Sequence, residues 1–447
     1  MKKTVRSSIS PRSFIQLNKP GNTLLLCVIS FFGFFFASSL VYKFFYTGGF
    51  YQIAQARGIS APLATREIRI ESSSLRGLAK SRESLLAGNM IPRELYSKLM
   101  YSKEAIPSFE MSTGEKIQIG WDIELQNKTQ ILLDKMNITW GSLVALDPRT
   151  GKILALASRQ GDSKGPLALR ASFPAASIFK VITASAAIES KGLNEYSVIS
   201  FRGGNYTLNK FNYDVSSKSD TRRMLLGEAF GKSCNPVFGR LALGYIGAKR
   251  LSGYAESFLF NRSIPFDLKL SKSKFSFPDN DLNLARSGAG FENSFISPLH
   301  AAMLAATFGN KGVTMKPYLV SEISNHLDGE NTNGETYITE PSVIGRPILE
   351  STANEVMQMM EYTTTSGTAR RFFKNFRATS QDAAIGKTGT LSGLYPEGRY
   401  HWFIGLAPRS NPEVAVAALV IDRGAPRVNG SGLARAFLDN YFSQKIE

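Results

Sequence analysis

The chain contains few cysteines and few histidines for its 447 residues. Its two cysteines, Cys27 and Cys234, lie in segments of different character and are not expected to pair, so a hydrophobic core rather than disulfides must hold the fold. The three histidines lie in separate segments, without cysteine or carboxylate neighbours at metal-ligand spacing. No glycine-rich phosphate loop precedes a helix. We therefore expect no metal and no other cofactor.

Acidic residues are also scarce. Against 53 Lys and Arg there are 36 Asp and Glu, which gives a formal net charge of +17. No basic run is interleaved with aromatic residues, so nucleic acid is not an expected partner. An anionic wall polymer or lipid headgroups would suit the positive charge, and a generally basic, solvated surface would explain it equally well.

One long apolar run, Thr23–Val41, contains no charged residue. At about 1.5 Å per residue it spans close to the roughly 30 Å hydrocarbon core of a bilayer. Five Lys and Arg residues precede it, and the positive-inside bias places them in the cytoplasm. Residues 1–22 are thus predicted to be a cytoplasmic tail and 23–42 a single transmembrane anchor in a bacterial cytoplasmic membrane, with the remainder exported. A cleavable signal peptide is the alternative, although its apolar core is usually about 7–15 residues long.

The exported part divides by sequence character near residue 117. Residues 43–117 are mixed, with helical stretches and no catalytic constellation, and are predicted to form a stalk or small pedestal. Residues 118–447 form the predicted main domain. Its predicted elements are a hairpin over Ser142–Ser158, helical segments over Ala176–Ile188, Met224–Leu243 and Pro298–Phe308, a polar surface loop NHLDGENTNGET, strands in AAIGKTGT, HWFIGLAP and VAVAALVID, and a final helix GLARAFLDNYF. Hairpins near both ends with helices between them predict an α+β fold, in which one antiparallel sheet is sandwiched by helices and the two chain ends meet.

The stretch FPAASIFK places a serine and a lysine three positions apart in an apolar, alanine-rich run. If Pro174 begins a helix there, Ser177 and Lys180 lie one turn apart on the same face. A lysine can activate a serine hydroxyl when burial and nearby positive charge lower the pKa of its amine. Ser-x-x-Lys is nevertheless a weak pattern, and it recurs as Ser271 and Lys274 in a charged, loop-like stretch.

Two further motifs follow FPAASIFK, namely GKSCNP, which contains Ser233 and Asn235, and GKTGT, which contains Lys387 to Thr390. In this order the three motifs resemble those of the penicillin-binding transpeptidases and serine β-lactamases. The resemblance extends from about Lys116 to Phe442, through IGWDIELQNKTQ, GSLVALDPRTGKILALAS, SGAGFENSFISPLHAAMLAATFGNKG, TTTSGTARR and HWFIGLAPRSNPEVAVAALVI. It implies the family's antiparallel sheet between helices, without a cofactor.

The resemblance also implies roles for the residues of the first two motifs. Ser177 would be the acylated nucleophile and Lys180 its general base. Ser233 would relay a proton to the leaving amine, and Asn235 would hold an amide of the substrate. Cys234 would point away from the cleft as a packing residue. The family often has Pro-Gly before the nucleophile, where this chain has two alanines after Pro174.

The third motif is implied to bind the substrate. Lys387, Thr388 and Thr390 would hold its terminal carboxylate, with the Lys387 ammonium lowering the pKa of Lys180. Gly389 would let the substrate lie along the strand as an added strand. The backbone N–H groups of Ser177 and Thr390 would form an oxyanion hole.

Three activities are compatible with the residues of these three motifs. A D,D-transpeptidase would pass the stem peptide of peptidoglycan, ending in D-Ala-D-Ala, to an acceptor amine, and β-lactams would acylate it; a D,D-carboxypeptidase differs only in using water. A serine β-lactamase would need a second base, for which the nearest match, ESFLFN at Glu256–Asn261, has one residue too many. A sensor or scaffold would bind without turnover. With no glycosyltransferase module expected, a separate glycosyltransferase or membrane partner is implied.

Overall fold

The computed structural model describes residues 99, 106–110, 115–161, 167–215, 217–291, 294–325, 336–378, 382–424 and 428–444. These residues all lie in one of the chain's two compact units, Ser74–Glu447. The predicted tail, the anchor at 23–42, residues 326–335 of the loop NHLDGENTNGET and nearly all of the predicted stalk lie outside the described residues. The first and last residues of that predicted loop, Asn325 and Thr336, lie in strands. Within the described part of the chain, no helix is long and apolar enough to cross a bilayer.

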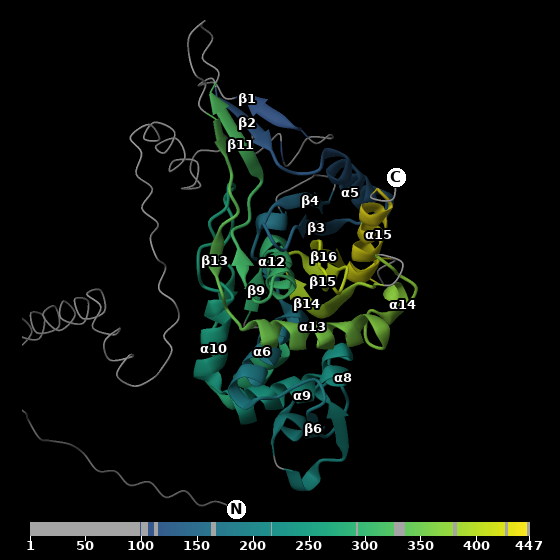
Figure 1. Ribbon diagram of the computed structural model, residues 1–447. Coiled ribbons are helices and arrows are strands. Elements are labelled where there is room, and N and C mark those ends of the chain that lie inside the picture. Colours follow the sequence, from purple (N-terminus) through teal and green to yellow (C-terminus); the bar gives the residue numbers. More distant parts are fainter. Residues whose placement is uncertain are drawn as a thin grey trace, which may run out of the picture. The chain divides into compact units, whose positions relative to one another are not determined.

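A five-stranded antiparallel sheet forms the centre of the fold, in the order β14-β15-β16-β3-β4 (Figure 1). Its strands are β3 Trp140–Leu146, β4 Ile153–Gln160, β14 Ile385–Leu394, β15 Glu397–Ala407 and β16 Val414–Asp422. The predicted hairpin is confirmed, because Ser142 pairs with Ser158. The two ends of the domain meet where β3 pairs with β16. Strand β14 is left as an edge strand.

Successive side chains along the strands belong in turn to two hydrophobic clusters, one on each face of the sheet. In β16, Ala417 and Leu419 belong to one cluster, whereas Val416 and Ala418 belong to the other, as expected for side chains that alternate along a strand. Helix α12 (Pro298–Gly309) packs on the first face, and α5 (Ile123–Lys135) and α15 (Gly430–Ser443) cover the second. The predicted α+β fold with a sheet sandwiched by helices is thereby confirmed.

The remaining elements surround this core. The helices are α6 Lys180–Lys191, α7 Lys210–Tyr213, α8 Leu226–Gly231, α9 Asn235–Arg240, the π-helix η5 Leu241–Ile246, α10 Ala248–Ser257, α11 Asp281–Ala289, α13 Glu350–Thr365 and α14 Arg370–Phe373, with 3-10 turns η2 Leu167–Leu169, η3 Ala176–Phe179 and η4 Ser217–Ser219. The smaller sheets are formed by β1 Ser108–Glu110, β2 Glu115–Ile119, β11 Val320–Asn325 and β12 Thr336–Ile338; by β5 Phe173–Pro174, β9 Ser294–Ile296 and β8 Lys274–Phe275; by β6 Val198–Phe201 and β7 Arg222–Leu225; and by β10 Thr314–Met315 and β13 Val343–Gly345.

Two predicted helices differ from the structure. The segment Met224–Leu243 is not one helix: it begins in strand β7, breaks between α8 and α9, and ends in η5. The break occurs because Ser233 takes a left-handed φ of 57° and Pro236 then suits the first turn of a new helix. Pro174 does not begin a helix either. It lies in β5 and pairs with Phe295, and the helical path starts two residues later.

Candidate active site

The serine of FPAASIFK lies in a 3-10 turn between a short strand and a long helix. Pro174 ends β5, η3 contains Ser177, and α6 begins at Lys180. The indole N–H of Trp402 donates to the Pro174 carbonyl at 2.9 Å, which ties the start of this turn to the central sheet. Ser177 is thus held on a short turn at the sheet, ahead of the α-helix rather than inside it.

Backbone strain is concentrated just before Ser177. Ala176 has a φ of 50°, in the left-handed region that a Cβ disfavours by roughly 1–2 kcal/mol. Gly290 fits against it: a Cβ at position 290 would lie 2.1 Å from the Ala176 carbonyl oxygen. The loop after α11 therefore closes tightly over the turn. The strain also accounts for the family's frequent glycine before the nucleophile, a position at which this chain has Ala176.

The amine of Lys180 makes three short contacts. Its Nζ lies 2.7 Å from Ser177 Oγ, 2.8 Å from Asn235 Oδ1 and 2.7 Å from the Ala289 carbonyl oxygen. The amide and carbonyl oxygens can only accept, so each requires one N–H. A neutral amine has two N–H bonds and one lone pair, and with both bonds used its lone pair points at the Ser177 hydroxyl. The geometry therefore suits Lys180 as the acceptor of the serine proton.

Burial supports this protonation state. The Lys180 side chain has no exposed surface, and desolvation lowers the pKa of its amine from 10.5 to about 7. The resemblance implied that the Lys387 ammonium would also lower this pKa, whereas burial is the cause that lowers it here. The repulsion between the two lysines contributes to the lowered pKa of Lys387, after burial.

The lowered pKa predicts a pH dependence of serine acylation. Below about pH 7 Lys180 carries a proton and cannot accept another, whereas above it the amine is neutral. We expect the acylation rate constant to rise with pH to a plateau, with a midpoint near 7, and to fall about tenfold per unit well below it. Stopped-flow labelling with a fluorescent penicillin between pH 5.5 and 9 measures this; a flat profile would contradict a titrating base.

The other two motifs meet at the same place. The Nζ of Lys387 donates to Ser233 Oγ at 3.0 Å and to the Thr388 carbonyl at 2.9 Å, and the Lys387 side chain is fully buried. Ser233 and Asn235 both line the cleft, whereas Cys234 has no exposed surface. The structure therefore brings the serine and lysine of FPAASIFK, the GKSCNP turn and the GKTGT strand together.

Ser177, Ser233, Asn235, Thr388 and Thr390 line one cavity of about 420 Å³. Gly389 lies close to the nucleophile turn, where a Cβ would come within 3.2 Å of Ile178 N. The Ser271 and Lys274 copy of the pattern does not line this cavity, and both of these residues are exposed. Of the two Ser-x-x-Lys copies, only the one that contains Ser177 contributes to this cavity among the described residues.

Several other residues line the cavity that none of the three sequence motifs contains. They are Tyr206, Ala289, Gly290, Phe291, Thr368, Leu391, Arg399, His401, Trp402, Asn429, Gly430 and Ser431. Thr368 comes from TTTSGTARR, and its hydroxyl lies 2.5 Å from that of Thr388 while its N–H donates to the Gly231 carbonyl at 3.1 Å. Thr368 therefore links α8 to β14. The resemblance of its segment was the only available signal.

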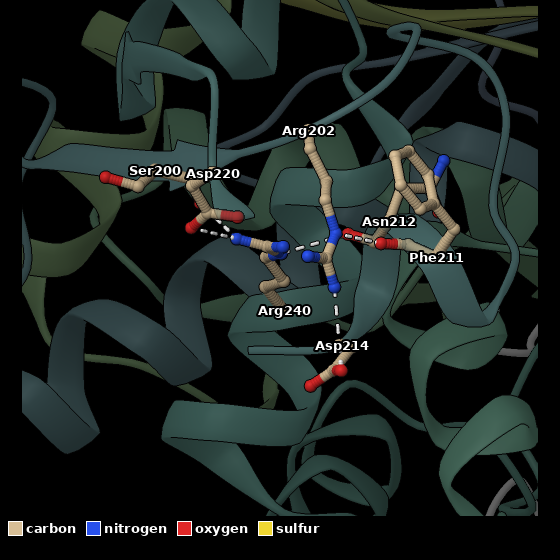
Figure 2. A network of polar contacts seen from close by, with 7 residues as sticks. All are labelled: Ser200, Arg202, Phe211, Asn212, Asp214, Asp220 and Arg240. Atoms are coloured by element: carbon tan, nitrogen blue, oxygen red, sulfur yellow. Dashed lines mark hydrogen bonds and ion pairs between the residues drawn. The ribbon is translucent and has the colours of Figure 1, made fainter. Parts of the chain in front are cut away.

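The cavity wall beside Asn235 is held by a network of polar contacts (Figure 2). The Asn235 side-chain amide donates to the Tyr206 carbonyl at 2.8 Å. At the other end of the helix that begins at Asn235, the Arg240 guanidinium donates to Ser200 O at 2.8 Å, to Asn212 O at 2.9 Å and to Asp220 Oδ2 at 2.6 Å. Arg240 ends the short helix that Asn235 begins, so one helix joins the cleft to the network.

A second arginine extends the network. Arg202 pairs with Asp214 at 3.5 Å and donates to the Phe211 carbonyl, and its guanidinium lies over the Phe211 ring (Figure 2). The segment between β6 and β7, which supplies the Tyr206 wall, is thus held by contacts of Arg202 and Arg240 in addition to the pairing of the two strands that flank it.

Breaking the Arg240–Asp220 pair is predicted to destabilise the fold. Both side chains are less than a tenth exposed, so Asp220→Ala would leave a buried charge without its partner, at a cost of roughly 3–5 kcal/mol. Urea unfolding followed by circular dichroism measures the free energy of unfolding. As a control, Lys128→Ala removes an exposed helical ion pair and should change that free energy by less than about 1 kcal/mol. Equal effects of the two substitutions would contradict a stabilising role for the buried pair.

Comparison with known proteins places this site in a family. The model of the penicillin binding protein transpeptidase domain matches residues 141–442. The chain belongs to the penicillin-binding protein transpeptidase family. The match contains all three motifs, and the predicted family resemblance is thereby confirmed.

Relatives within this family agree in sequence and fold. The chain is 30% identical over 335 residues to peptidoglycan D,D-transpeptidase PbpA of Mycobacterium tuberculosis, covering 66% of this chain and 64% of that protein. It is 26% identical over 252 residues to penicillin-binding protein 3 of Bacillus subtilis, covering 50% and 37%. The crystal structure of PBPA from M. tuberculosis superposes with a TM-score of 0.60 at 23% identity, covering 86% of this chain and 89% of that one. The chain thus shares the transpeptidase fold, and spans just under two thirds of the PbpA sequence.

Proposed function

We propose that the protein is a serine-type D,D-transpeptidase that cross-links peptidoglycan stem peptides and is acylated by β-lactams. The observation that carries this proposal is the set of Lys180 contacts, in which two acceptor oxygens occupy the N–H bonds and leave the lone pair for Ser177. The family match supports it. Solved structures of penicillin-binding protein A from M. tuberculosis include a penicillin G acyl-enzyme complex, which agrees with the same chemistry.

In the proposed acylation step, Ser177 Oγ attacks the carbonyl carbon of the penultimate D-alanine and its proton passes to Lys180. A hydrogen bond from Lys387 orients Ser233, which would relay the proton taken up by Lys180 to the amine of the terminal D-alanine as its C–N bond breaks. Thr388, Thr390 and Lys387 would hold the terminal carboxylate. Because a nearby anion raises the pKa of an amine, the bound carboxylate would favour the charged form of Lys387, whose pKa burial lowers in the free protein.

In the proposed second step, the amine of another stem peptide attacks the acyl-enzyme carbonyl. The ester to Ser177 breaks, the new amide forms, and the proton lost by the attacking amine returns to the serine through Lys180. The backbone N–H groups of Ser177 and Thr390 would stabilise the oxyanion in both steps. Carboxypeptidation would use water in place of the amine.

Rapid hydrolysis of a β-lactam is less well supported by the cavity. No Asp or Glu is found among the described residues that line it. Glu256, the sequence candidate for a second base, is exposed on α10 and does not line the cavity. The described wall therefore contains no carboxylate of the kind that a β-lactamase would use to activate water on the acyl-enzyme.

We further propose that Thr23–Val41 anchors the chain in the cytoplasmic membrane, with the catalytic domain outside. The length of the run and the cations before it support this topology. A transpeptidase working there would act on glycan strands made by a separate glycosyltransferase.

The proposed function is tested with the full-length protein and two substrates. A fluorescent penicillin, followed by mass spectrometry, reports the acyl-enzyme. An acyl-D-Ala-D-Ala peptide with an added amine acceptor then reports transfer against hydrolysis. A long-lived adduct on Ser177 together with an amide product is the expected result. Rapid loss of the adduct would indicate a β-lactamase, a hydrolysed peptide alone a carboxypeptidase, and no adduct a binding protein without turnover.

A further inference from the structure

The cavity extends past the proposed carboxylate site along strand β15. On this side its lining includes Thr390, Arg399 and His401. His401 stands opposite Thr390 in the β14–β15 pair, and Arg399 stands opposite Ser392. Residues two apart in a strand face the same side of the sheet. Arg399 and His401 therefore share a face with Thr390, next to the edge strand that the acyl donor is proposed to follow.

The side chain of His401 has one buried polar atom without a hydrogen-bond partner among the described residues. This atom is Nε2. A buried polar atom without a partner costs free energy. Among the described residues, eight side-chain atoms are in this state, and His401 is the residue among them that lines the cavity. Burial, followed by the positive charge of Arg399, lowers the pKa of the imidazole, so His401 is neutral at pH 7 and can donate one N–H bond. In the tautomer that carries its proton on Nε2, His401 therefore provides a donor without an internal acceptor at the edge of the cavity.

Arg399 supplies positive charge beside this donor. Its side chain is exposed, and no carboxylate of the described residues forms an ion pair with it. The nearest acidic residue by strand register is Asp422, directly opposite on β16. One oxygen of Asp422 accepts the Gly424 N–H at 2.7 Å, within its own turn. Asp422 offsets part of the charge but leaves the guanidinium hydrogen bonds available.

We propose that Arg399 and His401 form a second anion subsite, which binds a carboxylate on the acyl part of the donor. The inference rests on the proposed acylation of Ser177 and adds specificity to it. Neighbouring strands lie about 4.8 Å apart and residues two apart about 7 Å, so this carboxylate would lie roughly 5–10 Å from the one at Thr388 and Thr390. The ligand class is an acyl donor with two carboxylates, whether a peptide with an acidic side chain or a penicillin with one.

Two penicillins that differ by one carboxylate test the subsite. Carbenicillin is benzylpenicillin with a carboxylate added on its acyl side chain. For each full-length protein, the second-order rate constant for acylation by carbenicillin is divided by that for benzylpenicillin. The intrinsic reactivities of the drugs cancel when this ratio is compared between proteins. We expect Arg399→Ala to lower the ratio about tenfold and His401→Ala to lower it severalfold, as for lost hydrogen bonds to a charged group.

Three further variants sharpen the test. Arg399→Lys keeps the charge and should retain most of the ratio, whereas Arg399→Glu should lower it further than alanine. Arg262→Ala removes one exposed positive charge outside the cavity and should leave the ratio unchanged. Thermal unfolding of every variant shows that the fold is kept.

The outcomes separate the subsite from the proposed function. If both penicillins acylate all variants and the ratio stays constant, the second subsite is overturned while the transpeptidase assignment stands. An equal fall of the ratio in Arg262→Ala would also overturn it, because overall charge would then explain the effect. If neither penicillin acylates the parent protein, the proposed function and the subsite fail together.

Discussion

Ser177→Ala is expected to abolish the covalent adduct with penicillin, with acylation falling at least about 10⁴-fold. The methyl group of alanine cannot attack the lactam carbonyl, and no other hydroxyl among the described cavity residues has an amine as close as 2.7 Å. Ser233, the nearest alternative, accepts from Lys387, whose Nζ also donates to the Thr388 carbonyl. Gel fluorescence and intact mass spectrometry after incubation with a fluorescent penicillin measure the loss.

The second copy of the pattern provides a matched control for this variant. Ser271→Ala makes the same substitution three residues before a lysine, outside the cavity, and should label as the parent does. Persistent labelling of Ser177→Ala at another residue would show that the nucleophile is misassigned.

Lys180→Ala is the second large expected effect, with acylation falling roughly 10²–10⁴-fold, the usual contribution of a general base. The substitution removes the only amine that touches Ser177 among the described residues. It also leaves Asn235 Oδ1 and the Ala289 carbonyl without their shared donor. Stopped-flow labelling gives the rate constant, and far-UV circular dichroism shows whether the fold survives.

The pH profile distinguishes loss of the base from general damage. If Lys180 is the base, the residual activity of Lys180→Ala should lose the midpoint near pH 7, because the titrating amine is gone. Lys274→Ala should keep both the rate and the profile. A parent-like rate in Lys180→Ala would remove Lys180 from the mechanism.

Local sequence patterns predicted the sheet well because its strands are apolar and bounded by turns. The Ser142–Ser158 hairpin and the pairing of the chain's two ends followed from such patterns. The same reasoning was wrong for Met224–Leu243, where apolar composition suggested one helix. The sequence did contain a signal for the break in this helix. Pro236, two residues after the GKSC turn, favours the start of a new helix.

The contents of the site were predictable by side-chain type and much less so by backbone. Ser177 and Lys180 were singled out because their side-chain chemistry is visible in the sequence, and Lys387 was singled out through the resemblance of the GKTGT motif. The Ala289 carbonyl, which completes the contacts of Lys180, has no signature, since every residue carries one. The left-handed Ala176 was equally hidden, because its conformation is imposed by the turn and the closely packed Gly290 rather than by its own preference.

The central sheet has a consequence for the synthesis of the protein. Strand β3 pairs with β16, and Leu146 meets Ala415 roughly 270 positions later, so at about 5–20 residues per second the ribosome needs on the order of 15–55 s to supply the partner. Until then the hairpin β3–β4 emerges with an unpaired edge, and the strand of GKTGT does not exist. Ser177 is therefore synthesised well before the strand that completes its site. Until then, the exposed edge of the hairpin is where a chaperone would bind or aggregation would begin.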